Sequence, residues 1–226
     1  MQYREIEYKN EEEWHKIRRS YIGGSDCSII MGHNPFNEDI QKLWRVKTGR
    51  EEQKDLSNNP AIIRGKKSEN ILIEHFETNN PNYTVSKLEK TLVSLKHPFM
   101  CANLDGVLED VNGEKGVLEI KTAKIQNSNK YYDVWLCKDE ENRYTKTDIP
   151  LYYWLQIQHY LAVTGWKYAV LYADLKLEFQ GSRHILQKYE CLRNEEAIKE
   201  IIKKELEFNS YVINDVEPAY KKKIAI

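Results

Sequence analysis

Two short segments, NLDGVL and GVLEIKTA, place two carboxylates and a lysine close together in this sequence. Asp105 lies near the end of one expected strand, and Glu119 lies on the next strand, beyond the tight Asn112-Gly113 turn. Because side chains alternate along a strand, Glu119 and Lys121 leave the same face of the sheet. We therefore expect the three charged groups to form one compact cluster.

This set of groups suits the hydrolysis of a phosphodiester. Carboxylates favour a hard cation such as Mg²⁺ or Mn²⁺ over zinc, and magnesium usually takes one or two protein carboxylates together with phosphate oxygens. The metal polarises the phosphate, and the lysine can orient or help deprotonate the attacking water. Spacing alone is also typical of a plain Asp-Gly turn and a solvated Glu-x-Lys strand, so further features must decide.

One such feature is a carboxylate on an apolar helical stripe. The periodicity predicts a helix over residues 65–78 in which Glu69 shares a face with Leu72, Ile73 and Phe76. An inward carboxylate is costly unless it is paired or binds a metal. Glu69 is therefore a candidate for the same site.

A second feature lies in YWLQIQHYLAVTG, where Gln156 and Tyr160 are one helical turn apart on a helix expected over residues 151–164. Taken alone, such a pair is typical of ordinary helix surface. Together with the acidic cluster, it adds a possible hydrogen-bonding support.

The remaining elements follow from periodicity and turn residues. Ser25 or Asp26 is expected to cap a short helix that ends at Met31, and Asn37 is expected to cap the next helix. The other expected elements are a helix over 10–19, a β-meander over 83–122, a polar loop over 123–148, strands over 166–175 and 183–192, and a helix over 195–209. This order predicts an α/β sandwich around one mixed sheet, in a single domain of residues 1–226.

Composition narrows the class of protein. The 226 residues are 41% hydrophobic and 31% charged, which excludes a disordered chain, and no apolar run reaches the ~20 residues of a membrane span. The first residues are too polar for a signal peptide, so we expect a cytoplasmic protein without membrane contact. The net charge of −1 gives no overall attraction to nucleic acid. Four widely spaced cysteines are expected to be reduced thiols: Cys27, Cys101, Cys137 and Cys191.

In their order, the motifs resemble the PD-(D/E)xK nuclease core. Within that superfamily the chain is similar to the phage lambda exonuclease or YqaJ-type viral recombinase family. The resemblance runs from WHKIRRSYIGGSD through GKKSEN, NLDGVL and LEIKTA to LQIQHYLAVTG. The chain departs from the pattern at Leu104, where Pro is expected, and at Thr122-Ala123, where some relatives have Cys-Pro. The last 50 residues carry no matching motif.

The resemblance implies a role for each matching residue. Asp105 and Glu119 correspond to the metal carboxylates, and the backbone carbonyl of Ile120 adds a ligand. Lys121 corresponds to the catalytic lysine. The remaining catalytic positions are Glu69, which holds the water shell or a second ion, Gln156, which supports the site, and Tyr160, which completes the motif.

The resemblance also implies a site for a terminal 5′-phosphate. Arg18 and Ser25 match a pair that grips this phosphate, and Arg19 is placed to share the task. This is physically reasonable, because Arg binds phosphate with two parallel hydrogen bonds. A serine at a helix start also places backbone N–H groups near an anion.

The function implied is a metal-dependent 5′-to-3′ exonuclease acting on linear double-stranded DNA with a 5′-phosphate. It would use Mg²⁺, with Mn²⁺ as a substitute, and would leave 3′ single-stranded overhangs for a single-strand annealing protein in phage-type recombination. The resemblance further implies a ring-shaped homotrimer, encoded by a phage or prophage and active in the bacterial cytoplasm.

Two other functions fit the same residues. The first is a structure- or sequence-specific DNA endonuclease of the same superfamily, which would cut a closed circle. The second is a non-catalytic protein that binds DNA ends on a decayed nuclease fold. The iron–sulfur nucleases of this superfamily are disfavoured, because Cys191 is the only cysteine in the last 85 residues.

Overall fold

The computed structural model describes residues 2–36, 38–53, 56, 58–138, 144–145 and 149–219. Its helices and strands follow in this order: β1 (Tyr3–Glu7), α1 (Glu11–Ser20), α2 (Gly24–Ile30), α3 (Ile40–Lys47), α4 (Pro60–Asn79), β2 (Tyr83–Ser86), β3 (Lys90–Ser94), β4 (Cys101–Ala102), β5 (Gly106–Asp110), β6 (Lys115–Ile125), α5 (Ser128–Val134), β7 (Cys137–Lys138), β8 (Tyr144–Thr145), α6 (Leu151–Thr164), β9 (Tyr168–Leu177), the 3₁₀ turn η1 (Glu178–Gln180), β10 (Arg183–Leu192) and α7 (Glu195–Ile213).

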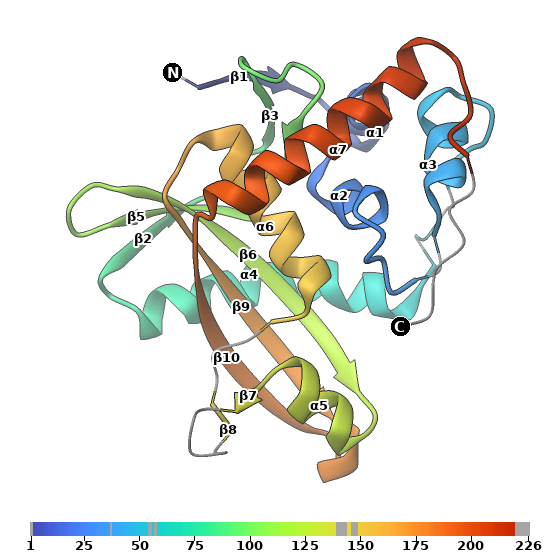
Figure 1. Cartoon of the computed structure of the whole chain (residues 1–226). Helices are drawn as coiled ribbons and strands as arrows, with labels where there is room; N and C mark the ends of the chain where they lie inside the picture. The colour runs from blue at the N-terminus through green and yellow to red at the C-terminus, as the bar shows by residue number, and fades with distance from the viewer. Residues whose placement is uncertain are drawn as a thin grey trace.

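A five-stranded mixed sheet forms the centre, in the order β10-β9-β6-β5-β2 (Figure 1). β5 and β6 form an antiparallel hairpin, and β6 pairs in parallel with β9 after the crossover through α6. Such a parallel pair requires a long connection, which the helix provides. The predicted α/β fold around a mixed sheet is confirmed.

Helices cover both faces of this sheet (Figure 1). Leu72, Ile73 and Phe76 of α4 pack against one face, where they share a core with Leu118 and Ile120 of β6. α6 packs against the other face. Because side chains alternate along β6, Glu119 and Lys121 point to the opposite face of the sheet, toward α6.

The expected meander over 83–122 is wrong in one respect. β2 joins the central sheet beside β5, but β3 pairs with β1 and β4 in a separate three-stranded sheet. The strand periodicity of β3 is correct, but periodicity does not specify the partner of a strand. β1 supplies that partner, and no strand was predicted over its residues.

The expected polar loop over 123–148 is also wrong in part. β6 continues to Ile125 because its pairing with β9 extends to Leu177, and α5 follows directly. Most of the later part of this segment lies outside the described residues.

Asn10 caps α1 and Asn194 caps α7, whereas the caps predicted for α2 and α3 need correction. Gly23, rather than Ser25 or Asp26, is the cap of α2, and Asp26 accepts the Gly23 N–H at 2.9 Å from within the first turn. The predicted cap Asn37 lies outside the described residues, and Asp39 caps α3 by accepting from the Lys42 N–H at 2.7 Å.

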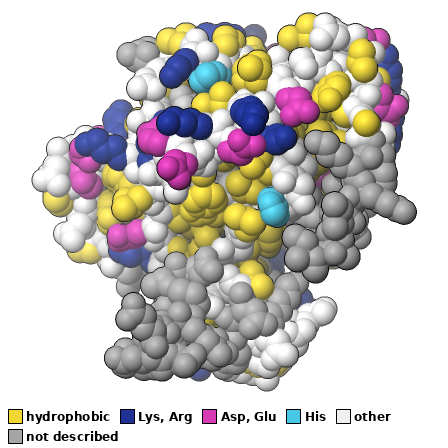
Figure 2. Space-filling view, viewed as in Figure 1, with side chains coloured by type: hydrophobic (Ala, Val, Ile, Leu, Met, Phe, Trp, Pro, Cys, Tyr) yellow, Lys and Arg dark blue, Asp and Glu magenta, His cyan; other side chains and the backbone are white. Residues whose placement is uncertain are grey.

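The surface carries charges of both signs. On the face shown in Figure 2, Lys and Arg side chains are mixed with Asp and Glu side chains across the upper part, with hydrophobic side chains below. Cys27, Cys101 and Cys191 are buried free thiols, as expected. Over the described residues, none of the helices has the length and apolar character needed to cross a bilayer.

Candidate active site

Hydrogen bonds join the predicted acids, lysine and glutamine into one cluster. Asp105, directly before β5, accepts the Ile120 N–H at 2.8 Å. Glu119 Oε1 accepts from Gln156 Nε2 at 2.6 Å and from Lys121 Nζ. Gln156 also donates to the Tyr160 hydroxyl at 3.0 Å. The β-hairpin therefore positions the acids, and α6 positions the glutamine and tyrosine.

The carboxylates of Asp105 and Glu119 are buried near each other, an arrangement that a bound cation would stabilise. Glu119 is 1% exposed, and its Oε2 is buried without a hydrogen-bond partner among the described residues. Burial and the neighbouring Asp105 raise the pKa of Glu119 to about 8, although Lys121 opposes the shift. Burial likewise raises the pKa of Asp105. An orphaned carboxylate oxygen beside a second carboxylate fits a divalent cation with oxygen ligands.

Glu69 stands at the border of this cluster. It is partly buried, on the helical stripe that the sequence predicted to face inward. Burial and the Asp105 carboxylate raise its pKa. The helix acid is therefore electrostatically connected to the acids of the hairpin.

Lys121 is enclosed by an aromatic ring as well as by the acids. Its side chain is 20% exposed, and Nζ lies 5.2 Å from the centre of the Tyr153 ring. Burial alone would lower the pKa of Lys121, but Glu119 and Asp105 raise it overall. The lysine is thus held as a cation above the acids.

The three predicted phosphate-binding residues line a cleft of about 200 Å³ that adjoins the acidic cluster. Arg18 and Arg19 come from α1, Ser25 comes from the first turn of α2, and Arg18 donates to the Ser25 hydroxyl. The Arg18 guanidinium also lies 5.1 Å from the Trp14 ring. Gln156 lines the same cleft, so the cleft reaches the acidic cluster.

A buried ion pair that the sequence did not reveal forms part of the wall of this cleft. Lys47 Nζ lies 2.7 Å from Asp26 Oδ2, and it donates to the carbonyls of Arg18 at 2.9 Å and Tyr21 at 2.5 Å. Burial alone would raise the pKa of Asp26, but Lys47 and Arg18 lower it overall. The one sequence signal was the position of Lys47, which shares a helical stripe with Leu43 and Trp44.

Gly24 sets the spacing between the cleft and α6. A Cβ at this position would lie 2.5 Å from the Tyr160 ring and 2.9 Å from Gln156 Cγ. Only glycine permits this approach of α2 to α6, which brings Ser25 and Gln156 to one cleft.

Comparison with known proteins agrees with this arrangement. Residues 13–167 match the family of YqaJ-like viral recombinase domains. The chain belongs to this family. The predicted resemblance is therefore confirmed.

Among its relatives is the uncharacterized protein YqaJ of Bacillus subtilis (strain 168), which is 34% identical over 223 residues. The match covers 95% of this YqaJ-family chain but 62% of that relative.

Solved structures share the fold at low sequence identity. The alkaline exonuclease of Laribacter hongkongensis superimposes with a TM-score of 0.62 at 17% identity, over 91% of this chain and 94% of that one. Its complex with dAMP gives a TM-score of 0.64 at 16% identity, with the same coverage of 91% and 94%. A phage-related exonuclease from Haemophilus somnus 129PT gives 0.53 at 12%, over 89% and 99%.

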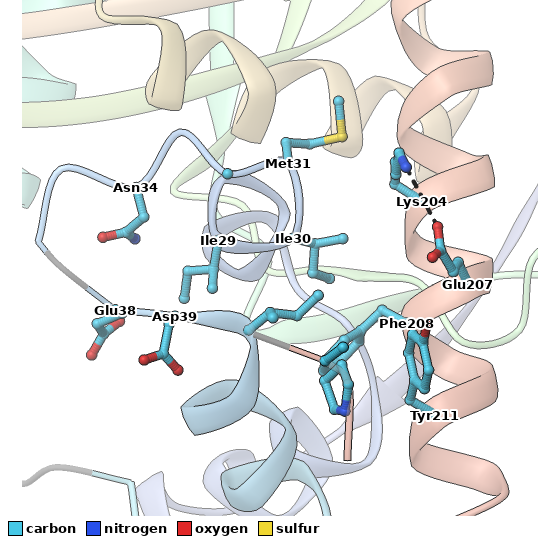
Figure 3. A pocket seen from close by; sticks show the side chains of 14 residues that line it. Ile29, Ile30, Met31, Asn34, Glu38, Asp39, Lys204, Glu207, Phe208 and Tyr211 are labelled. Atoms are coloured by element: carbon cyan, nitrogen blue, oxygen red, sulfur yellow. Dashed lines mark hydrogen bonds and ion pairs between the residues drawn. The ribbon is translucent and has the colours of Figure 1, made fainter. Parts of the chain in front are cut away.

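A second cavity of this YqaJ-family chain lies away from the acidic cluster. It measures about 580 Å³ and is enclosed by Ile29 and Ile30 of α2 and by Phe208 and Tyr211 of α7 (Figure 3). None of the predicted site residues lines it. It shares Ile29, Asn34 and Glu38 with the smaller cleft, so one wall separates the two.

A buried group of Cys27, His159 and Glu205 joins α2, α6 and α7. Their ligand atoms lie within 4.8 Å of one another, a spacing compatible with a metal ion. His159 already uses both nitrogens, Nδ1 with Glu205 Oε1 at 2.8 Å and Nε2 with the Cys101 carbonyl at 2.8 Å. Burial and Glu205 raise the pKa of the Cys27 thiol well above its usual range. The Cys27 thiol is held in its protonated form, and both nitrogens of the His159 imidazole already have hydrogen-bond partners. We therefore interpret this group as a structural link between the three helices.

Proposed function

We propose that this chain is a metal-dependent 5′-to-3′ exonuclease that degrades one strand of linear double-stranded DNA from a 5′-phosphate. The observation that carries the proposal is the cleft in which Arg18 and Ser25 lie beside Gln156, next to the carboxylates. In one site, the chain has groups that bind a terminal phosphate and groups that activate the following phosphodiester.

The resemblance extends the proposal to the biological setting. The 3′ overhang left by digestion would serve a single-strand annealing protein during phage-type recombination, and a homotrimer is proposed as the active form. The product would be a mononucleotide, and the Laribacter hongkongensis alkaline exonuclease was solved in complex with dAMP.

The donor set indicates how a cation would be held. Asp105, Glu119 and the Ile120 carbonyl are proposed ligands for Mg²⁺ or Mn²⁺, and Glu69 would hold its water shell or a second ion. When bound, the cation supplies Lewis-acid polarisation of the scissile phosphate. The orphaned Oε2 of Glu119 supports this assignment.

The side chains around the cation divide the remaining tasks. Lys121 donates to the attacking water and orients it, because its Nζ lies against Glu119 at the open side of the cluster. Gln156 fixes the Glu119 carboxylate, and Tyr160 fixes Gln156. Arg18 and Ser25, with Arg19 beside them, hold the terminal phosphate, so each cleavage exposes a new 5′-phosphate for the same site.

A digestion assay with Mg²⁺ tests the proposal. The substrate is linear duplex DNA with one 5′-phosphate end and one 5′-hydroxyl end, and a closed circle is the control. Loss of one strand from the phosphorylated end, with an intact circle, is expected. Cleavage of the circle would indicate an endonuclease, and end binding without cleavage in Mg²⁺ or Mn²⁺ would indicate a non-catalytic protein.

A further inference from the structure

Phe36 presents its ring to solvent next to the phosphate cleft. It is 71% exposed, and no other Phe, Tyr or Trp side chain among those that the structure describes is as open to solvent. Its backbone is held, since the Phe36 N–H donates to Asn34 Oδ1 at 2.7 Å. An exposed ring of this size forgoes the free energy that its burial in the core would contribute. Contact with a bound ligand would recover part of that free energy.

The ring belongs to an aromatic wall of the cleft. Phe36 and Tyr152 meet edge to face with ring centres 6.2 Å apart, and Tyr152 lies against Tyr153 at 4.2 Å. All three rings line the cleft that also contains Arg18 and Ser25. The wall ends at the acidic cluster, because Tyr153 lies under Lys121.

We infer that Phe36 and Tyr152 of this wall stack on the base of the 5′-terminal nucleotide whose phosphate is held by Arg18 and Ser25. The inference rests on the proposed function and names the part of the substrate that the rest of the cleft receives. A nucleotide carries its anion and its flat apolar base a few atoms apart, and the cleft offers cationic and aromatic groups in the same enclosure.

Stacking suits an exonuclease that must accept every sequence. Each of the four bases has a π-face, so a ring binds all of them without reading their edges. The site would thereby bind the terminal nucleotide tightly at every step, whichever base is present.

Binding of two small probes tests the inference without relying on cleavage. The full chain is titrated with dAMP and with 2-deoxyribose 5-phosphate, which lacks the base. The wild type should bind dAMP at least about fivefold more tightly, the lower end of base–aromatic stacking. Phe36→Ala should bring the two affinities to within about twofold, and Phe36→Trp should restore the difference.

Leu192→Ala is the matched control, because Leu192 is 74% exposed and lies outside the cleft. Equal affinities for the two probes in the wild type would overturn the inference, as would a Phe36→Ala variant that keeps the preference. Binding of neither probe would also overturn it. The digestion assay decides the proposed function separately, so a missing base preference in an active exonuclease would refute stacking alone.

Discussion

At the scale of single residues, the site depends on a few side chains with distinct contacts. Glu119 accepts two hydrogen bonds on Oε1 and, within the described part of the chain, none on Oε2. Lys121 lies between the Glu119 carboxylate and the Tyr153 ring, and Arg18 donates to the Ser25 hydroxyl. Each contact gives the residue a separate task, so substitutions should separate binding from chemistry.

Lys121→Ala should lower the rate of cleavage by about a hundredfold or more, the range of a lost proton-transfer or water-orienting group. DNA-end binding should survive, because the phosphate cleft is formed by other residues. Lys124→Ala is the control on the same strand, where Lys124 is 57% exposed and pairs with Glu178. Rates are measured by single-turnover digestion, and a wild-type rate in Lys121→Ala would refute the proposed role.

Arg18→Ala should remove the preference for phosphorylated over hydroxyl 5′ ends. A hydrogen bond to a charged group contributes about 1.5–3 kcal/mol, so the preference should fall by about tenfold or more. Competition between the two kinds of end in one reaction measures it. Arg50→Ala, which removes an exposed arginine paired with Asp215, should leave the preference as it is. If Arg18→Ala still prefers the phosphate, another group binds it.

Glu119→Gln should abolish stabilisation by divalent cations. In the wild type, Mg²⁺ or Mn²⁺ should raise the unfolding midpoint, since a ligand at 100 times its dissociation constant contributes about 2.7 kcal/mol. Thermal unfolding with and without each cation measures the effect. Glu114→Gln, at the β5–β6 turn, is the control that should keep the effect. A midpoint in Glu119→Gln that still rises would place the cation elsewhere.

At the scale of elements, sequence patterns predicted most of what lies within one strand or helix. Alternation along β6 correctly placed Glu119 and Lys121 on one face, and helical spacing correctly joined Gln156 to Tyr160. Contacts between distant segments were not predictable in this way. The pairing of β3 with β1 depends on a partner some 85 residues away in the chain, as shown by the ion pair between Lys90 and Glu5.

The same limit explains the parts of the site that the sequence missed. Lys47 and Asp26 come from different helices, and neither position has a local pattern that names its partner. Phe36 lies in a turn, where periodicity carries no information about which groups meet. The resemblance correctly predicted that Arg18 and Ser25 lie together, because it carried information on the whole fold.

The contact between α2 and α6 should be the most sensitive to added volume. Gly24→Ala places a Cβ 2.5 Å from the Tyr160 ring and should destabilise the protein by about 1–3 kcal/mol, as overpacked cores do. Gly65→Ala is the control in α4, where a Cβ would be 3.6 Å from Thr122 Oγ1 and the helix should gain about 0.5–1 kcal/mol. Urea unfolding of both variants measures the difference. Equal free energies of unfolding for the two variants would show that α2 moves away from α6 without loss of stability.

At the scale of the whole molecule, a buried ion pair links the layers of the fold. His159 of α6 contacts Glu205 of α7 and the carbonyl of Cys101 in β4. The helix layer, the C-terminal helix and the smaller sheet are thereby connected through one imidazole.

This pair predicts the dependence of stability on pH. Burial alone would lower the pKa of His159, but Glu205 raises it overall. Because the pKa of His159 is higher in the folded state than in the unfolded chain, its protonation stabilises the fold fully below about pH 6.5, the usual pKa of an unfolded histidine. This contribution declines as the pH rises from there through the folded-state pKa. The free energy of unfolding should therefore fall as pH rises through that range.

Glu205→Gln should make this decline shallower, leaving the part that comes from the raised pKa of Glu119. It should also lower stability below pH 6.5 by about 3–5 kcal/mol, because it removes one partner of a buried pair. His33→Gln, an exposed histidine in the turn after α2, should retain the wild-type slope. Urea unfolding between pH 5.5 and about pH 9 measures both. A wild-type slope in Glu205→Gln would assign the pH dependence to another group.

The crossover from β6 through α6 to β9 also bears on how the site comes into being. Asp105 and the Ile120 N–H are 15 residues apart and meet in a hairpin, whereas Glu119 and Gln156 are 37 residues apart and meet only after the crossover. Short loops close at a lower entropic cost than long ones, and local contacts form early in folding. During synthesis of the chain, we therefore expect Asp105 and Glu119 to come together in the hairpin before Gln156 can hydrogen-bond to Glu119. The proposed nuclease activity is therefore expected only late in folding, once Gln156 of α6 has reached Glu119.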